Sequence, residues 1–199
     1  MTKSTPTSAK DLLEALESDS DFQAMRLEQE RNRLKRMEAL IQEQAPIMQD
    51  LHKVGIIETN LGDLMMRGKP YPMAIDTLLH HFLLPYSDQT RNILARCLAV
   101  PDAKFAWPVL RAEYLKLPAI SSPSAKDGIA VALSATATDM NFADVADLLR
   151  DRSQGPTRIY LLKYLWRSKN PLAIQLIEDL SSDSDLYKEI ASWKKKRKR

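Results

Sequence analysis

Cysteine, glycine and long apolar runs are scarce in this chain. Its 199 residues include one cysteine, Cys97. A single thiol excludes a disulfide within the chain, and Cys97 falls on the apolar side of an expected helix, so we interpret it as a small buried hydrophobe. No apolar run is long enough to span a membrane, and the polar N-terminus does not resemble a signal peptide. We therefore expect a cytoplasmic protein without a membrane span.

Strand-like alternation of apolar and polar residues is also missing over any useful length. Only 5 glycines and few runs of β-branched residues argue against a sheet, whereas a hydrophobic content of 44% is enough to bury a sizeable core. The sequence predicts an all-α fold.

The usual signatures of catalysis are absent as well. There is no glycine-rich phosphate loop, no Gly-x-Ser-x-Gly elbow and no cluster of cysteine ligands. His80 and His81 are adjacent, so on a helix they point about 100° apart and do not form the i, i+4 pair that a metal prefers. We expect no enzyme, no metal site and no cofactor.

The excess of basic residues is confined to the last six positions. This tail consists of Lys194, Lys195, Lys196, Arg197, Lys198 and Arg199. The whole chain has a formal charge of +3, but without the tail 23 basic residues face 26 acidic ones, a charge of −3. Because nucleic-acid affinity comes mostly from phosphate neutralisation, the body is a poor general nucleic-acid surface. The tail is either a contact for nucleic acid or an acidic partner, or a solvated end of the last helix.

What is present is a helical repeat. Four stretches share apolar residues at i, i+3 and i+4 and begin at Ala74, Ala106, Asp144 and Ala173, spacings of 32, 38 and 29 residues. Each is followed by a second apolar stretch that begins near Thr90, Ala125, Thr157 or Tyr187. Each helix pair then has an apolar face that only the next pair can cover.

Three local motifs resemble HEAT-type repeats of the bacterial HEAT-like class: Ser87-Asp88-Gln89-Thr90-Arg91, Pro156-Thr157-Arg158 and Asn170-Pro171-Leu172-Ala173. The resemblance covers about the last two-thirds of the chain and implies a short right-handed α-solenoid of about four helix pairs. Solenoids of this class serve as scaffolds, inhibitors, enzyme subunits, lyases and nucleic-acid binders, so the resemblance predicts a fold rather than a function. Gly128 and Pro123 depart from the pattern, and we expect the second repeat to be irregular.

The N-terminal third has a different organisation. Residues 1–19 are expected to be a disordered lead with a short helix, and residues 20–53 a long, coiled-coil-like helix with a stop or kink at Pro46. Leu27, Leu34, Ile41 and Met48 recur every seven residues, but the accompanying column is mostly polar. We therefore favour docking of this helix on the first repeat over dimerisation. Residues 54–71 are expected to be a capping helix and turn, 72–193 the repeat domain and 194–199 the basic tail.

Two columns of side chains are expected along the second helices. The first is basic in every repeat: Arg91, Lys126, Arg158 and Lys188. We favour a structural role for it, with Asp88, Asp151 and Asp185 as nearby acidic partners. The second column contains Arg96, Val131, Lys163 and Trp193 and has no such structural obligation. Its two cations and two neighbouring residues form the expected partner-binding set: Arg96, Tyr160, Lys163 and Arg167.

These observations predict a scaffold or adaptor that binds a protein with an acidic patch through the concave face of its inner helices. The alternative is a nucleic-acid-associated protein that uses the basic tail, and an enzyme subunit or lyase is a third possibility by analogy of fold alone.

Overall fold

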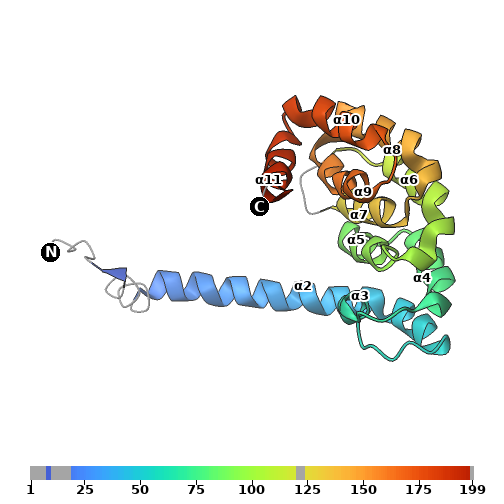
Figure 1. Cartoon of the computed structure of the whole chain (residues 1–199). Coiled ribbons are helices and arrows are strands. Elements are labelled where there is room, and N and C mark those ends of the chain that lie inside the picture. Colours follow the sequence, from blue (N-terminus) through green and yellow to red (C-terminus); the bar gives the residue numbers. More distant parts are fainter. Residues whose placement is uncertain (1–7, 10–18, 120–123, 198–199) are drawn as a thin grey trace. The chain divides into compact units, whose positions relative to one another are not determined.

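A computed structural model describes residues 8–9, 19–119 and 124–197. Every regular element within these ranges is a helix, which confirms the predicted all-α fold (Figure 1). The chain divides into two compact units, Met1–Glu43 and Gln44–Arg199. The expected disordered lead and short helix fall mostly on residues 1–7 and 10–18, which lie outside the described ranges.

The first unit is described almost entirely by the N-terminal part of helix α2 (Ser20–Lys53). Asp19 caps this helix, because its Oδ1 accepts hydrogen bonds from the backbone nitrogens of Asp21 (3.0 Å) and Phe22 (3.1 Å). The heptad residues Leu27, Leu34 and Ile41 are 66%, 51% and 65% exposed. Up to Ile41, the apolar column is therefore on the surface.

Helix α2 continues through Pro46 to Lys53, so of the stop or kink expected at this residue, the stop is wrong. Proline removes one backbone donor and disfavours a helix interior. Here Ile47, Met48 and Leu51 follow it directly and are buried in the core of the second unit. Their packing holds the last two turns helical, and Gly55, with a φ of 90°, takes the left-handed conformation just after the helix.

The second unit begins with the last turns of α2, continues with α3 (Leu61–Met66) and then alternates two rows of helices. Asn60 caps α3 by accepting from the backbone nitrogen of Asp63 at 2.9 Å. One row consists of α4 (Ile75–Phe82), α6 (Trp107–Lys116), α8 (Phe142–Arg150) and α10 (Leu172–Asp179) (Figure 1). The other consists of α5 (Asp88–Cys97), α7 (Ala125–Thr136), α9 (Leu162–Arg167) and α11 (Tyr187–Arg197). The first stretches of the sequence repeat lie in the first row and the second stretches mainly in the second.

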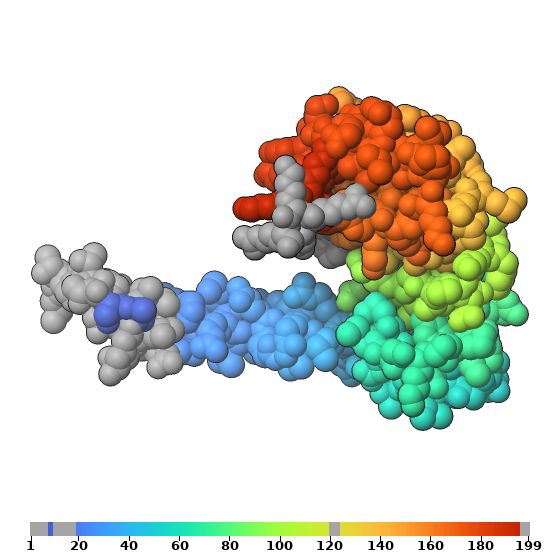
Figure 2. All heavy atoms as spheres, viewed as in Figure 1, coloured from blue at the N-terminus to red at the C-terminus, as the bar shows by residue number. Residues whose placement is uncertain are grey.

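Short 3-10 helices connect these elements. They are η1 (Pro72–Ala74), η2 (Pro101–Ala106), η3 (Asp139–Asn141), η4 (Arg152–Leu161) and η5 (Leu180–Ser182). Successive segments of the second unit occupy neighbouring bands of its surface, from cyan through green and orange to red (Figure 2). No helix within the described ranges has a stretch both long and apolar enough to cross a bilayer.

Gly128 makes the contact between α5 and α7 possible. A Cβ atom at this position would overlap the backbone carbonyl of Asn92. The side-chain amide of Asn92 in turn donates to the carbonyl oxygen of Ser124, just before α7. Gly128 does not interrupt α7, which is a continuous helix, and the glycine serves a close helix crossing. Pro123, the other residue from which we expected an irregular second repeat, lies outside the described residues.

The irregular element is in the third pair instead. Its inner helix starts as η4, where Gly155 has a φ of 67°, and becomes α-helical only at Leu162. The reversal at Gly155 and Pro156 separates Asp151 from Arg158, and the backbone carbonyl of Gly155 accepts from Arg158 Nε at 3.0 Å. Local turn chemistry therefore shortens α9 to six residues.

Replacing Gly128 by alanine is expected to lower the free energy of unfolding by about 1–3 kcal/mol, because the new methyl group meets backbone atoms that cannot rotate away. Chemical denaturation measures this change. Alanine normally stabilises an unobstructed helical glycine position by about 1 kcal/mol, so a gain in stability would contradict the close crossing.

Candidate functional site

The first basic column links each helix pair to the next. Arg91 Nη2 lies 3.0 Å from Glu113 Oε2 on α6. Lys126 Nζ donates to Gln154 Oε1 on η4 at 2.8 Å and to the carbonyl oxygen of Leu117. In the third pair, Arg158 bonds carboxylates that follow η5. Three members of the column are thus structural, as we had favoured.

The expected acidic partners of this column are only partly correct. Asp185 does bond Arg158, at 2.7 Å. Asp88 instead accepts from the backbone nitrogen of Ala125 at 3.0 Å, and Asp151 accepts from Ser153 and Gln154. Both carboxylates serve the backbone or an amide because each lies at the start of a turn or helix.

Arg158 is the most fully engaged polar side chain of the column. Its side chain is 0% exposed, and its nitrogens donate to Gly155 O (3.0 Å), Leu149 O (2.8 Å), both oxygens of Asp183 (3.0 and 3.1 Å) and Asp185 (2.7 Å). Burial disfavours the charged form of Asp183 and is the largest single influence on its pKa. The hydrogen bonds from Arg158 and the backbone of Asp185, together with the charges of Arg158 and Arg152, outweigh it, so the pKa of Asp183 is lowered. The stabilisation from this carboxylate is present above its unfolded-state pKa and is lost as the pH falls through the lowered value.

The four residues selected from the second column line one cavity of about 500 Å³. Arg96 comes from α5, Tyr160 from η4, and Lys163 and Arg167 from α9. The remaining lining side chains come from α7 and α11 and from the ends of α5 and η4: Ala99, Val131, Ser134, Ala135, Ile159, Glu189 and Trp193. Most of these are apolar, so the cavity combines an apolar wall with charged groups.

Arg96 and Tyr160 are held against each other in this cavity. The guanidinium carbon of Arg96 lies 5.9 Å from the centroid of the Tyr160 ring, and its Nε donates to Asn92 Oδ1 at 2.8 Å. Among the described residues, no acceptor bonds the two terminal nitrogens of Arg96. The side chain is therefore oriented while part of its donor capacity stays available.

Lys163 is the second cation with free donors in the cavity. It is exposed and has no hydrogen bond or ion pair with any residue that the structure describes. Glu189 is the one acidic residue of the lining, against the three basic residues Arg96, Lys163 and Arg167. The lining thus has a formal charge of +2.

Arg167 has a structural role that its sequence position did not predict. Its Nη2 donates to the carbonyl oxygens of Ala135 and Ala137, both at 3.1 Å, and to that of Ser134. These are carbonyls at the C-terminal end of α7, which a helix leaves without internal partners. Arg167 is thus a helix cap, and its position at the cavity does not leave it free.

Two tryptophans meet beside the cavity. The rings of Trp166 and Trp193 have centroids 5.1 Å apart in an edge-to-face arrangement. Trp193 lines the cavity and is half-buried, whereas Trp166 is 38% exposed. This pair joins the last turn of α9 to α11.

A buried polar cluster involving His81 was not anticipated from sequence. Its Nε2 lies 3.1 Å from Asp50 Oδ2, and its Nδ1 lies 2.9 Å from the hydroxyl of Tyr86. His80, its neighbour, is exposed. The contacts join α2 to α4 across 31 residues, a separation that local patterns do not encode.

The described residues include no group of three or more histidine, cysteine, aspartate or glutamate side chains that could hold a metal ion. Burial raises the pKa of the Cys97 thiol to about 12, which disfavours the nucleophilic thiolate. Cys97 Sγ instead lies 3.5 Å from the carbonyl oxygen of Leu61.

The basic tail begins within α11. Lys194 Nζ lies 2.6 Å from Glu178 Oε2, and Lys195 is exposed. Lys198 and Arg199 lie outside the described residues, as do the side chains of Lys196 and Arg197.

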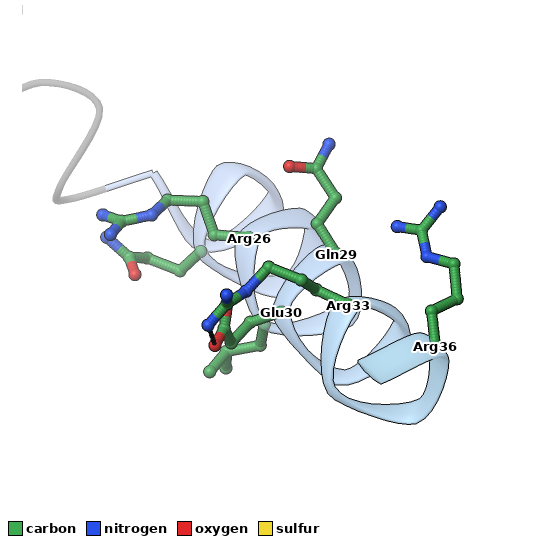
Figure 3. Close-up of a pocket in the computed structure, with 7 residues that line it drawn as sticks. Arg26, Gln29, Glu30, Arg33 and Arg36 are labelled. Carbon is green, nitrogen blue, oxygen red and sulfur yellow. Dashed lines mark hydrogen bonds and ion pairs between the residues drawn. The ribbon is translucent and has the colours of Figure 1, made fainter. Parts of the chain in front are cut away.

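A second basic surface lies on α2, where Arg26, Arg33 and Arg36 project from the helix near Gln29 (Figure 3). Arg33 is paired with Glu30 through two hydrogen bonds of 2.7 and 2.8 Å, and these bonds raise the pKa of Arg33. All lining residues of this surface belong to one helix, so it has no second wall to enclose a ligand.

Arg158 and Arg152 both contact Asp183, one buried and one exposed, so replacing each in turn tests how much burial adds to the stability that an ion pair contributes. Arg158→Ala is expected to lower the free energy of unfolding by about 3–5 kcal/mol, because Asp183 would stay buried without its main partner. Arg152 also contacts Asp183, at 3.3 Å, but its side chain is 72% exposed, so Arg152→Ala should cost less than about 1 kcal/mol. Equal losses in denaturant titrations would show that burial does not distinguish the two pairs.

No family model, curated protein or solved structure matches this chain.

Proposed function

We propose that this protein is a non-enzymatic interaction module, a short right-handed HEAT-like solenoid that binds a protein partner through its inner-helix row. The observation that supports this most directly is the cavity between α5, α7, α9 and α11, lined by Arg96, Tyr160 and Lys163. Arginine and tyrosine are effective interface anchors, and both cations retain unused donors.

The charges indicate the kind of partner. Arg96 and Lys163 form no ion pair with an acidic residue within the described ranges, and the cavity lining stays at +2 with Glu189 included, although the body of the chain has a formal charge of −3 without its tail. An acidic patch on a partner would complement this local positive charge and would be steered towards it.

The proposal predicts that Arg96→Glu combined with Lys163→Glu abolishes partner capture in an affinity purification with the full chain. The thermal midpoint should change by less than about 3 °C, since neither side chain is in a buried ion pair. Lys104→Glu, on an exposed residue of η2, is the control for added negative charge. A large fall in the thermal midpoint of the double variant would make these residues structural.

The alternative function is nucleic-acid association through the basic tail, and it rests on the six consecutive cations at residues 194–199. If it holds, the logarithm of the binding constant for RNA or DNA falls linearly with the logarithm of salt concentration. Deletion of the tail should then remove most of the affinity, by about tenfold or more at low salt, in a filter-binding assay. Nucleic-acid binding that survives the deletion would exclude the tail as its source.

A further inference from the structure

The cavity between the inner helices has the size and composition of a ligand pocket rather than of a flat contact surface. Its volume of about 500 Å³ falls within the range of such pockets, about 300–1,000 Å³. Its apolar wall is formed by Ala99, Val131, Ala135, Ile159 and Trp193. A wholly polar ligand would leave this wall without contacts.

The polar groups of the cavity favour an anion beside an apolar group. Arg96 and Lys163 supply donors that no described residue uses, and the ring of Tyr160 keeps the guanidinium of Arg96 in place. Arg167 is excluded from this role because it caps α7. The ligand should therefore present its negative charge to α5 and α9 and its apolar part to Trp193 and Ile159.

Ser134 also lines the cavity, but its hydroxyl is buried. The residue is 3% exposed, and its hydroxyl has no hydrogen-bond partner among the described residues. A buried hydroxyl without a partner destabilises the fold, so such groups usually have an acceptor. Because this hydroxyl is not open to the cavity, the polar groups available to a ligand there are those of Arg96 and Lys163.

We propose that this cavity binds a short segment of a protein partner in which an aspartate or glutamate adjoins an aromatic or branched apolar side chain. The inference rests on the proposed function and specifies its partner. Charge complementarity selects the acidic side chain, and the apolar wall selects its neighbour. A nucleic acid would offer charge without a matching apolar side chain, and the body of the chain is itself negative.

The test uses the full chain and a short capped peptide that alternates glutamate with phenylalanine and leucine. Binding is followed by the fluorescence of Trp193, and Trp193→Phe identifies its signal among those of the three tryptophans. Matched peptides carry glutamine in place of glutamate, or alanine in place of the apolar residues. The first peptide should bind in the micromolar range, and both matched peptides about tenfold more weakly.

Protein variants locate the site. Arg96→Glu and Lys163→Glu should each weaken peptide binding by about tenfold or more, whereas Lys104→Glu, outside the cavity, should leave it unchanged. Ser134→Ala should raise the thermal midpoint and leave peptide binding unchanged, because it removes a buried hydroxyl that lacks a partner and is not open to the cavity.

Several outcomes overturn the inference. They are no peptide binding up to millimolar concentration, equal binding of the glutamine peptide, or binding unaffected by both charge reversals. Equally tight binding of phenylacetate would assign the cavity to a small aromatic acid instead. If the peptide does not bind but capture of a protein partner is lost in the Arg96→Glu, Lys163→Glu variant, this inference is wrong and the proposed function stands. If that variant still captures the partner, the proposed function is wrong as well.

Discussion

The guanidinium of Arg158 is fully buried, and five hydrogen bonds account for its five donors. Its acceptors come from the end of α8, the turn within η4 and the segment after η5, so one side chain joins the third helix pair to the fourth. The same η4–α9 segment presents Tyr160 and Lys163 to the cavity. The position of the candidate binding residues thus depends on a polar group that has no access to solvent.

The other members of the first column extend this principle. Arg91 and Lys126 also reach the following helix pair, where each finds an acceptor suited to its own surroundings. Desolvation lowers the pKa of Lys126. Its ammonium group donates to the carbonyl oxygen of Leu117 and the amide oxygen of Gln154, and not to a carboxylate. Lys188, in the last pair, is exposed. The basic residues that recur at the start of the second helices, Arg91, Lys126 and Arg158, therefore bond the next helix pair. Arg96 and Lys163 do not belong to this column and keep unused donors.

The all-α fold was predictable from sequence because apolar spacing and the lack of strand-like alternation are local signals. Arg96 and Lys163 were grouped from their repeat positions, with Tyr160 and Arg167 as their neighbours, and the four residues line one cavity. Pro46 and Gly128 were misinterpreted because tertiary packing decided both: buried side chains after Pro46 keep α2 helical, and a crossing backbone requires Gly128. The cap by Arg167 and the cluster of Asp50, His81 and Tyr86 depend on contacts between distant segments, for which the sequence has no local marker.

Cys97 is the chain's one cysteine, and its sulfur faces the carbonyl oxygen of Leu61 in the core between α3 and α5. An alkylating reagent in solution therefore meets a thiol only when these two helices separate. Because no other thiol competes, the rate of modification would report how often the surroundings of Cys97 open, without an engineered label.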